Sequence, residues 1–416
     1  MSTGTLAVPQ DVQETGVPRT LLEGLALKIL YLSGELSLRE LAERMRLSMA
    51  AVDEVFQFLR KEQLCEVKGM AGGVHRIVAS GQGKARAAEL LSLNQYVGSA
   101  PVSLADYVTR IRAQSVRDVE VRPSDVERAF GSLVMTPDAL VRLGTAIVSG
   151  TSIFLYGPTG TGKTSVAEMI PNVYGDAVWI PYAVEVDHQI IAVYDSHVHQ
   201  ALDPLSSDDM DRRWVLCRRP RVIAGGELTF EMLDLQFNPA TRFYTAPLQM
   251  KANNGVLIID DFGRQRIRPD ELLNRWILPL DRRVDFLSLA GGKKFEIPFD
   301  LFVVFATNLN PAELADEAFL RRIQNKIKMD YVTREQFQEI FRRLCCQFEL
   351  SYDAAVVDHL IDVMLKGLNQ PLRSCYPRDI VQQICWSARY RGGRPQLDQK
   401  TVEQACRNYF LPRESV

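Results

Sequence analysis

The stretch Ser152-Ile-Phe-Leu-Tyr-Gly-Pro-Thr-Gly-Thr-Gly-Lys-Thr164 decides the fold of this 416-residue chain. Its first five residues form a short apolar run, which predicts a buried parallel strand. The remainder matches the phosphate-binding pattern GxxxxGK(S/T), and residues 165–170 continue as a helix. A Gly-rich surface turn would share this composition but would not require the flanking strand and helix. The stretch therefore predicts an α/β P-loop fold that binds a nucleotide.

The phosphate loop contains the residues expected to bind the nucleotide and its metal ion. Its glycines let backbone N–H groups converge on phosphates, and the helix N-terminus adds partial positive charge. We expect Lys163 to reach the β- and γ-phosphates and the Thr164 hydroxyl to coordinate Mg²⁺, so the predicted cofactors are ATP and Mg²⁺. The predicted nucleotide-binding residues are Gly157, Pro158, Thr159, Gly160, Thr161, Gly162, Lys163, Thr164 and Ser165.

Two later apolar runs also end in polar residues. Residues 256–259 precede Asp260 and Asp261, and residues 301–306 come shortly before Asn308. Because open α/β sheets bind ligands at the carboxyl ends of their parallel strands, we expect these side chains beside the phosphate loop. Asp260 would hold Mg²⁺, Asp261 would orient and deprotonate the attacking water, and Asn308 would hydrogen-bond the γ-phosphate or that water. An acidic turn after a strand would explain the aspartates alone, but not their pairing with the upstream loop.

Two adjacent arginines, Arg321 and Arg322, follow the third apolar run. A rigid, permanently charged guanidinium suits a role in which one subunit neutralises charge on the ATP of its neighbour. Taken in isolation, a solvated basic helix end explains the same pair.

The order of these motifs resembles the AAA+ superfamily over about residues 126–411. In that resemblance residues 157–164 are the Walker A motif, residues 256–261 the Walker B motif, and Asn308 is sensor one. The resemblance implies that Arg321 or Arg322 is an arginine finger, and we favour Arg322 because it directly precedes an apolar residue. It further implies that Arg378, at the start of a lid helix, contacts the γ-phosphate in cis.

The same resemblance implies the partners. Residues 269–280 are expected to form a helix, and residues 282–289 and 294–297 a β-hairpin, as in MoxR-like and related hairpin-bearing AAA+ groups. In such groups the hairpins face the ring pore or the substrate. The expected assembly is a homo-oligomeric ring, a hexamer, that hydrolyses ATP to ADP and phosphate and remodels or helps assemble a protein partner in a chaperone-like way.

Two features depart from the family pattern. The family usually has Glu after the Walker B aspartate, whereas this chain has Asp261. The shorter side chain predicts slow hydrolysis, or an ATP-gated switch. In addition, 97 residues separate Lys163 from Asp260, which predicts an insertion near residues 183–228.

The remaining regions give the expected domain order. Residues 1–19 are expected to be a flexible tail, 20–80 a winged helix-turn-helix-like domain, and 81–125 a helical connector. Residues 126–329 would be the α/β nucleotide-binding subdomain, and residues 333–411 an all-α lid.

The winged-helix-like region is not the basic module that DNA binding favours. Residues 1–100 contain 11 Lys and Arg against 11 Asp and Glu, and the candidate reading helix carries Asp53 and Glu54. Since phosphate contacts dominate DNA affinity, we favour protein interaction here. An ATP-gated DNA-binding regulator remains the alternative function, with nucleic acid as its partner.

The overall composition is that of a cytoplasmic protein. The formal net charge is −2, and no apolar run approaches the roughly 18 residues of a membrane span, so no membrane insertion is expected. The first residues do not have the pattern of a secretion signal. Seven scattered cysteines without a CxxC pattern predict reduced thiols.

Overall fold

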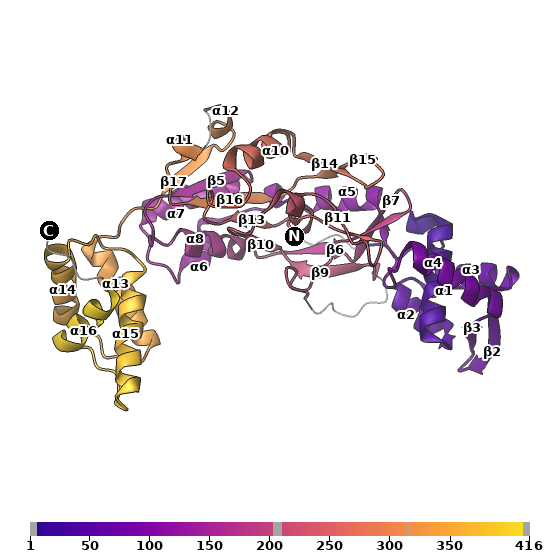
Figure 1. Ribbon diagram of the computed structural model, residues 1–416, viewed down its shortest axis with the longest axis horizontal. Coiled ribbons are helices and arrows are strands. Elements are labelled where there is room, and N and C mark those ends of the chain that lie inside the picture. Colours follow the sequence, from indigo (N-terminus) through magenta and orange to yellow (C-terminus); the bar gives the residue numbers. More distant parts are fainter. Residues whose placement is uncertain (1–5, 203–209, 315–316, 411–416) are drawn as a thin grey trace. The chain divides into compact units, whose positions relative to one another are not determined.

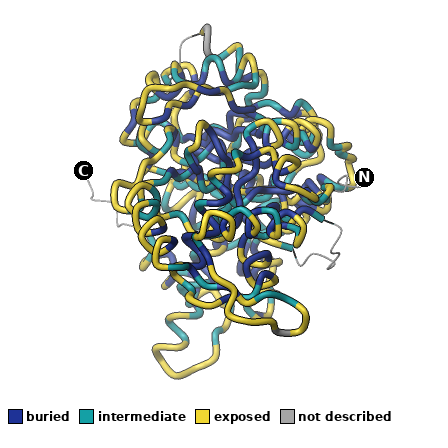
Figure 2. Tube along the Cα trace, turned by 90° about the vertical axis from the view of Figure 1, so that its right-hand side faces the viewer, coloured by how far each residue is buried: buried dark blue, intermediate teal, exposed yellow. Residues whose placement is uncertain are grey.

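The computed structural model describes residues 6–202, 210–314 and 317–410 (Figure 1). The chain forms two compact units, each assembled from several segments. The first unit comprises residues 1–119, 175–257 and 274–302, and the second comprises residues 120–174, 258–273 and 303–416. Buried and exposed stretches alternate along the trace, as expected for elements that each turn one face to a core (Figure 2). None of the described helices combines the length and the apolar character needed to cross a bilayer.

The first unit begins with a small helical region. Its helices share a core that includes Leu22, Leu41 and Phe56, and Ser37 and Ser48 cap the second and third helices. The helix over residues 49–61 begins directly after Ser48, whose hydroxyl accepts a hydrogen bond from the Ala51 amide. The elements are η1 (Gln13–Thr15), α1 (Arg19–Ser33), β1 (Leu36–Ser37), α2 (Leu38–Met45), α3 (Met49–Lys61), β2 (Cys65–Ala71), β3 (Val74–Ala79) and α4 (Gly81–Leu93), with sheet order β1-β3-β2.

We expected a flexible tail over residues 1–19, but residues 8–18 pack against the helical region. Residues 1–5 lie outside the described part. Val12 and Val17 are buried in the core of the helical region, where each removes apolar surface from water. The Val12 amide donates a hydrogen bond to Glu54, and the Ser48 hydroxyl donates to the Pro9 carbonyl. These contacts involve residues about forty positions away, so local composition could not indicate them.

The first unit also contains a mixed five-stranded sheet with order β11-β12-β8-β7-β4, in which β11-β12 and β8-β7 pair antiparallel and β12-β8 and β7-β4 pair parallel. The expected insertion forms part of it, although residues 203–209 lie outside the described part. Residues 81–125 are more than a helical connector, because β4 pairs with β7. The predicted hairpin is confirmed as β14 and β15. The elements are β4 (Val102–Ser103), α5 (Leu104–Ala113), η2 (Val116–Asp118), β6 (Ala177–Pro181), β7 (Ala183–Val186), β8 (Gln189–Ala192), β9 (Trp214–Arg218), η4 (Phe230–Leu233), β11 (Gln236–Phe237), β12 (Tyr244–Thr245), α9 (Leu248–Lys251), β14 (Val284–Ser288) and β15 (Lys294–Pro298).

A five-stranded sheet with order β10-β13-β16-β5-β17 carries the phosphate loop. β16 and β17 lie on either side of β5, and both run parallel to it. The strands predicted from the three apolar runs are confirmed as β5, β13 and β16. The elements are α6 (Pro123–Phe130), α7 (Pro137–Val148), β5 (Ser152–Tyr156), α8 (Lys163–Met169), η3 (Ile170–Val173), β10 (Arg221–Ala224), β13 (Val256–Ile259), α10 (Pro269–Arg282), β16 (Phe302–Thr307), α11 (Pro311–Leu314), α12 (Glu317–Leu320) and β17 (Asn325–Lys328).

The C-terminal part of the second unit is a helical bundle, as expected for a lid. Phe337, Leu360, Ile380 and Val402, one from each long helix, meet in its core. The elements are α13 (Arg334–Gln347), α14 (Ala354–Asp362), the π-helical turn η5 (Val363–Gly367), α15 (Tyr376–Tyr390) and α16 (Gln399–Tyr409).

A buried ion pair connects three distant segments of the first unit. Arg213 and Asp211 have side chains only 3% and 5% exposed, and lie 2.8 Å apart. The Arg213 guanidinium also donates to the carbonyl oxygens of Thr15, at 2.8 Å, and Pro101, at 3.2 Å. Removing the arginine would leave a buried carboxylate and two buried carbonyls without their donor.

We therefore expect Arg213→Met to destabilise the first unit by about 3–5 kcal/mol, the cost of leaving one partner of a buried pair uncompensated. The matched control is Arg212→Met, because Arg212 is the exposed neighbour and its replacement should change stability by no more than about 0.5 kcal/mol. Urea unfolding followed by fluorescence gives both values. Equal midpoints for the two variants would contradict the assignment.

Candidate nucleotide-binding site

The phosphate loop adopts a backbone conformation that its glycines alone permit. Gly157, Gly160 and Gly162 have φ values of 140°, 78° and 88°, in the left-handed region. A Cβ on Gly157 would lie 2.1 Å from the carbonyl oxygen of Met329, which follows the neighbouring strand β17. The loop is thus pressed against the adjacent strand end, and its conformation depends on the absence of side chains.

Lys163 lies over this loop at the start of α8. Its side chain is buried, and its ammonium donates to the carbonyl oxygens of Gly157, at 3.0 Å, and Pro158, at 2.8 Å. Burial lowers the pKa of Lys163, while the charges of Asp261 and Asp260 act in the opposite direction. The ammonium is therefore held at the position where the sequence pattern expects a phosphate-binding cation.

The two predicted magnesium ligands lie in contact. The Thr164 hydroxyl donates to the Asp260 carboxylate, with distances of 3.1 and 2.9 Å to its two oxygens. A hydroxyl and a carboxylate are oxygen ligands of the kind Mg²⁺ uses when waters and phosphates complete its shell. Among the described residues no group of three or more His, Cys, Asp or Glu is arranged to hold a metal. The donor set at Thr164 and Asp260 therefore fits Mg²⁺ bound together with a nucleotide, and not a closed protein-only metal site.

Asp261 and Asn308 also meet at this edge of the sheet. The Asn308 amide donates to the Asp261 carboxylate at 3.0 Å. Asp261 has a φ of 48°, which is uncommon for a residue other than glycine. The turn is held by Gln265, whose amide donates to the Asp260 carbonyl at 2.7 Å and whose amide oxygen accepts from the Gly263 N–H at 2.8 Å. Sequence reasoning missed Gln265, because only the folded turn brings it back to the strand end.

A cavity of about 760 Å³ opens beside the loop. This is within the size range of small-ligand pockets, about 300–1,000 Å³. Its wall combines apolar side chains with a few polar and charged groups. Lining residues include Val134, Thr161, Val166, Met169, Val332, Ile340, Arg378 and Asp379. Most of these were not predicted, because apolar side chains on separate helices carry no local signal for a ligand.

The segment before α15 touches the phosphate loop directly. The Ser374 hydroxyl donates to the Gly160 carbonyl at 3.1 Å, and the Cys375 amide donates to the same oxygen at 3.2 Å. The Arg373 Cδ lies 3.3 Å from the position that a Cβ on Gly160 would occupy. Its buried Nε has no hydrogen-bond partner among the described residues. Arg373 is thus a cationic neighbour of the loop that sequence reasoning missed.

The predicted arginines differ in their surroundings. Arg378 is exposed near the start of α15 and lines the cavity. Arg321 is exposed and Arg322 half-buried, directly after α12, and neither lines that cavity. The described part of the second unit therefore brings Asp260, Asp261 and Asn308 to the phosphate loop and Arg378 to the cavity beside it, while Arg321 and Arg322 are not among the residues that line that cavity.

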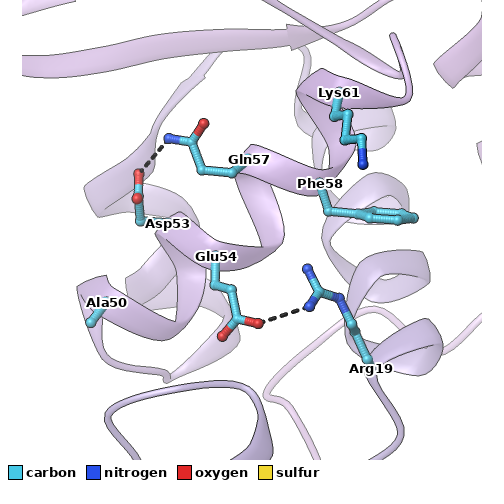
Figure 3. Close-up of a pocket in the computed structure, with 7 residues that line it drawn as sticks. All are labelled: Arg19, Ala50, Asp53, Glu54, Gln57, Phe58 and Lys61. Atoms are coloured by element: carbon cyan, nitrogen blue, oxygen red, sulfur yellow. Dashed lines mark hydrogen bonds and ion pairs between the residues drawn. The ribbon is translucent and has the colours of Figure 1, made fainter.

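A second hollow lies on the surface of α3 in the first unit (Figure 3). Arg19 points into it and pairs with Glu54 at 2.8 Å and Glu23 at 2.7 Å, with its guanidinium 5.4 Å from the Phe58 ring. The Gln57 amide donates to Asp53 at 3.4 Å. Because Arg19 already pairs with two carboxylates, its guanidinium is not available to bind an anion in this hollow.

Comparison with known proteins gives limited matches. A family model described as a domain of unknown function, DUF8689, matches residues 333–408, which contain the helical bundle. No curated protein matches the chain. Among solved structures, the chain is similar to a RuvB mutant from Thermotoga maritima, at 12% identity and a TM-score of 0.37 over 70% of this chain and 72% of that chain. It is similar too to the Thermotoga maritima RuvB Holliday junction branch migration motor, at 13% identity, a TM-score of 0.36 and 69% of each chain.

The glycine conformation generates a direct test. We expect Gly157→Ala to abolish nucleotide binding, because its Cβ would meet the Met329 carbonyl and a backbone of this kind costs about 1–3 kcal/mol outside glycine. Gly81→Ala is the control, since a Cβ there meets nothing within 4 Å. Titration with a fluorescent ATP analogue measures both variants, and wild-type affinity in a folded Gly157→Ala chain would refute the loop geometry.

Proposed function

We propose that the chain is an AAA+ ATPase that binds ATP with Mg²⁺ at the phosphate loop and hydrolyses it. The observation that carries the proposal is the convergence of two pairs of polar residues. Thr164 and Asp260 are 96 residues apart in sequence, and Asp261 and Asn308 are 47 apart, yet both pairs are hydrogen-bonded. These hydrogen bonds support a role of Thr164 and Asp260 at a metal ion, and of Asp261 and Asn308 at a water nucleophile, beside the phosphate loop.

Each residue has a defined task in this proposal. The loop amides and Lys163 bind the β- and γ-phosphates, and Thr164 and Asp260 hold the metal ion. Mg²⁺ held by Thr164 and Asp260 would neutralise the negative charge that develops on the phosphates. Asp261 accepts a proton from the attacking water, and Asn308 orients that water or the γ-phosphate.

The cavity beside α8 is suited to the base and ribose of the nucleotide. Val166 and Met169 provide apolar surface, and Thr161 and Asp379 provide polar groups. Arg378 lines the same cavity, and we assign it to the phosphates in cis. Arg373 is a second cation within reach of the loop, because its side chain packs against Gly160.

Asp261 makes slow hydrolysis the expected behaviour. An aspartate is one methylene shorter than the glutamate usual at this position of the AAA+ pattern. Its carboxylate is also engaged by Asn308, so it must exchange this hydrogen bond before it can accept a proton from water. Both features reduce the fraction of time in which the Asp261 carboxylate is positioned to accept a proton from the attacking water.

We expect Asp261→Asn to lower the ATPase rate by about 10²–10⁴-fold, the range of general base catalysis, while ATP binding persists. Asp261→Glu should raise the rate by extending the carboxylate toward the water. Steady-state phosphate release measures both, with Asp270→Asn as the control because Asp270 only pairs with Arg268 at the surface. An unchanged rate in Asp261→Asn would show that Asp261 is not the base.

We further propose that ATP is bound between subunits of a homo-oligomeric ring, a hexamer, in which Arg322 reaches the neighbour's γ-phosphate. The support is that Arg322 lies outside the lining of the cavity in its own subunit. Arg321, the more exposed neighbour, is the other candidate finger.

We expect Arg322→Ala to reduce the rate by about 10³-fold or more, the lower end for an arginine finger, and Arg321→Ala to reduce it less than tenfold. Mixing Arg322→Ala subunits with Lys163→Ala subunits should recover activity, because mixed interfaces join an intact loop to an intact finger. Phosphate release at several mixing ratios measures this recovery. No recovery at any ratio, in mixtures shown to co-assemble, would refute action between subunits.

The client is proposed to be a protein, remodelled or assembled in a chaperone-like manner, as in MoxR-like groups. The hairpin β14–β15 supports this, because Phe286 stands on it with 45% of its surface exposed. The alternative of an ATP-gated DNA-binding regulator would require α3 to approach phosphates. Asp53 and Glu54 on α3, the second of which pairs with Arg19 of α1, disfavour that role for this winged-helix-like region (Figure 3).

A further inference from the structure

The last two turns of α15 expose two large aromatic side chains that the proposed ATPase does not use. Trp386 is 57% exposed and Tyr390 is 92% exposed. They are four positions apart on one helix, so they lie on the same face with Cβ atoms about 5–6 Å apart. A soluble surface rarely presents two adjacent aromatic rings unless a partner covers them.

Unpaired positive charge surrounds these rings. Arg389, Arg391 and Arg394 are all exposed. Within the described residues none of the three guanidinium groups has a hydrogen bond or an ion pair. The sequence from 380 to 397 contains no Asp or Glu, so the segment carries three positive charges without local compensation.

The turn after the helix leaves room for a close approach. The amides of Gly392 and Gly393 close the helix on the carbonyls of Arg389 and Ala388, at 3.1 and 3.0 Å. A Cβ on Gly392 would meet nothing within 4 Å, so this turn is open on its outer side. Arg391 and Arg394 flank the two glycines, and Tyr390 precedes them. We call Trp386, Arg389, Tyr390, Arg391 and Arg394 the aromatic–arginine patch.

The patch is separate from the nucleotide-binding site. Arg378 and Tyr390 are twelve residues apart on one straight helix, which places their Cα atoms about 18 Å from each other (Figure 1). None of the five patch residues lines the cavity beside the phosphate loop. The patch is therefore a second surface, inside the region matched by the domain of unknown function.

We propose that the aromatic–arginine patch binds a single-stranded polynucleotide, with bases stacked on Trp386 and Tyr390 and phosphates held by the three arginines. Single-strand binders combine aromatic stacking platforms with cationic contacts to the backbone, and Arg-Gly-Gly segments are among them. Guanidinium groups pair with phosphate in a bidentate geometry. Stacking needs only the face of a base, so single-stranded DNA and RNA are both bound, with little dependence on sequence.

An acidic protein segment would satisfy the arginines but would not explain the rings. Tyr390, the last residue of α15, is 92% exposed, so the described residues cover almost none of its ring. A ring with both faces accessible matches a planar base. Duplex DNA would also satisfy the arginines, but its bases are already stacked on each other and offer no free face.

The test uses the full-length chain and a fluorescein-labelled oligothymidine of about 16 nucleotides, the upper end of common site sizes. Fluorescence anisotropy reports binding as salt rises from about 50 to 200 mM. With three phosphate contacts the logarithmic salt slope should be about −2, so affinity should fall by about 15- to 20-fold over this range. Oligouridine of the same length should bind similarly, and duplex DNA and polyglutamate more weakly.

The variants separate stacking from charge. Trp386→Ala and Tyr390→Ala should each weaken oligothymidine binding by about fivefold or more, and Trp386→Phe should retain most of it. Replacing Arg389, Arg391 and Arg394 together by Gln should flatten the salt slope. Arg407→Gln is the matched control, because Arg407 is an exposed lid arginine near the opposite end of α15, where Tyr409 contacts Tyr376. The ATPase rate without polynucleotide should not change in the patch variants.

Three results would overturn the proposal. The first is absence of binding at the lowest salt by folded protein. The second is equal binding of duplex or polyglutamate, unaffected by Trp386→Ala, which would reveal a surface for polyanions or acidic proteins. The third is loss of self-association in Trp386→Ala without any change in polynucleotide affinity, which would assign the patch to contacts between copies of the chain.

Discussion

The parallel alignment of β16 with β5 is the constraint on which the candidate site depends. Thr307 pairs with Tyr156 at the ends of the two strands, so the residues that follow them leave the sheet at the same level. Asn308 and Gly157 are those residues. Because β13 lies on the other side of β16, Asp260 and Asp261, which directly follow its last residue, emerge at that edge too. The polar contacts of the site follow from strand order, and no single loop could provide them.

The parts of this structure that sequence could predict are those with local causes. The strand over 152–156, its loop and the helix over 49–61 are specified by apolar runs, glycines and an N-cap serine within a few positions of each other. The contact of Arg213 with the Thr15 carbonyl joins residues 198 positions apart, and the approach of Arg373 to Gly160 is similarly remote. No local pattern encodes such contacts, so the tail packing, Arg373 and most of the cavity lining could not be predicted.

The turn that holds Asp261 beside Asn308 is well supported, but the side chain of Asp261 is short for a general base at this position. The turn that places it beside Asn308 requires a φ of 48°, which a side chain adopts at some energetic cost. Gln265 supports that turn by bonding back to Asp260. The backbone is thus held in one arrangement. The Asp261 side chain is too short to bring its carboxylate closer to the water from that fixed backbone position. A longer side chain at the same backbone position would reach further without any change in the turn, so the proposed slowness belongs to the residue and not to the fold.

The helix α15 connects the two surfaces to which we assign ligands. Arg378 near its start lines the cavity, and Trp386 and Tyr390 lie in its last turns. A packed helix of 15 residues, anchored in the core of the helical bundle by Ile380 and Ile384, moves as one body. If nucleotide binding shifts Arg378, it must shift the aromatic–arginine patch as well, and no additional chain of contacts is needed to transmit the motion. Thermodynamic reciprocity then requires that a ligand of the patch influence nucleotide affinity by the same factor, in whatever direction the coupling runs.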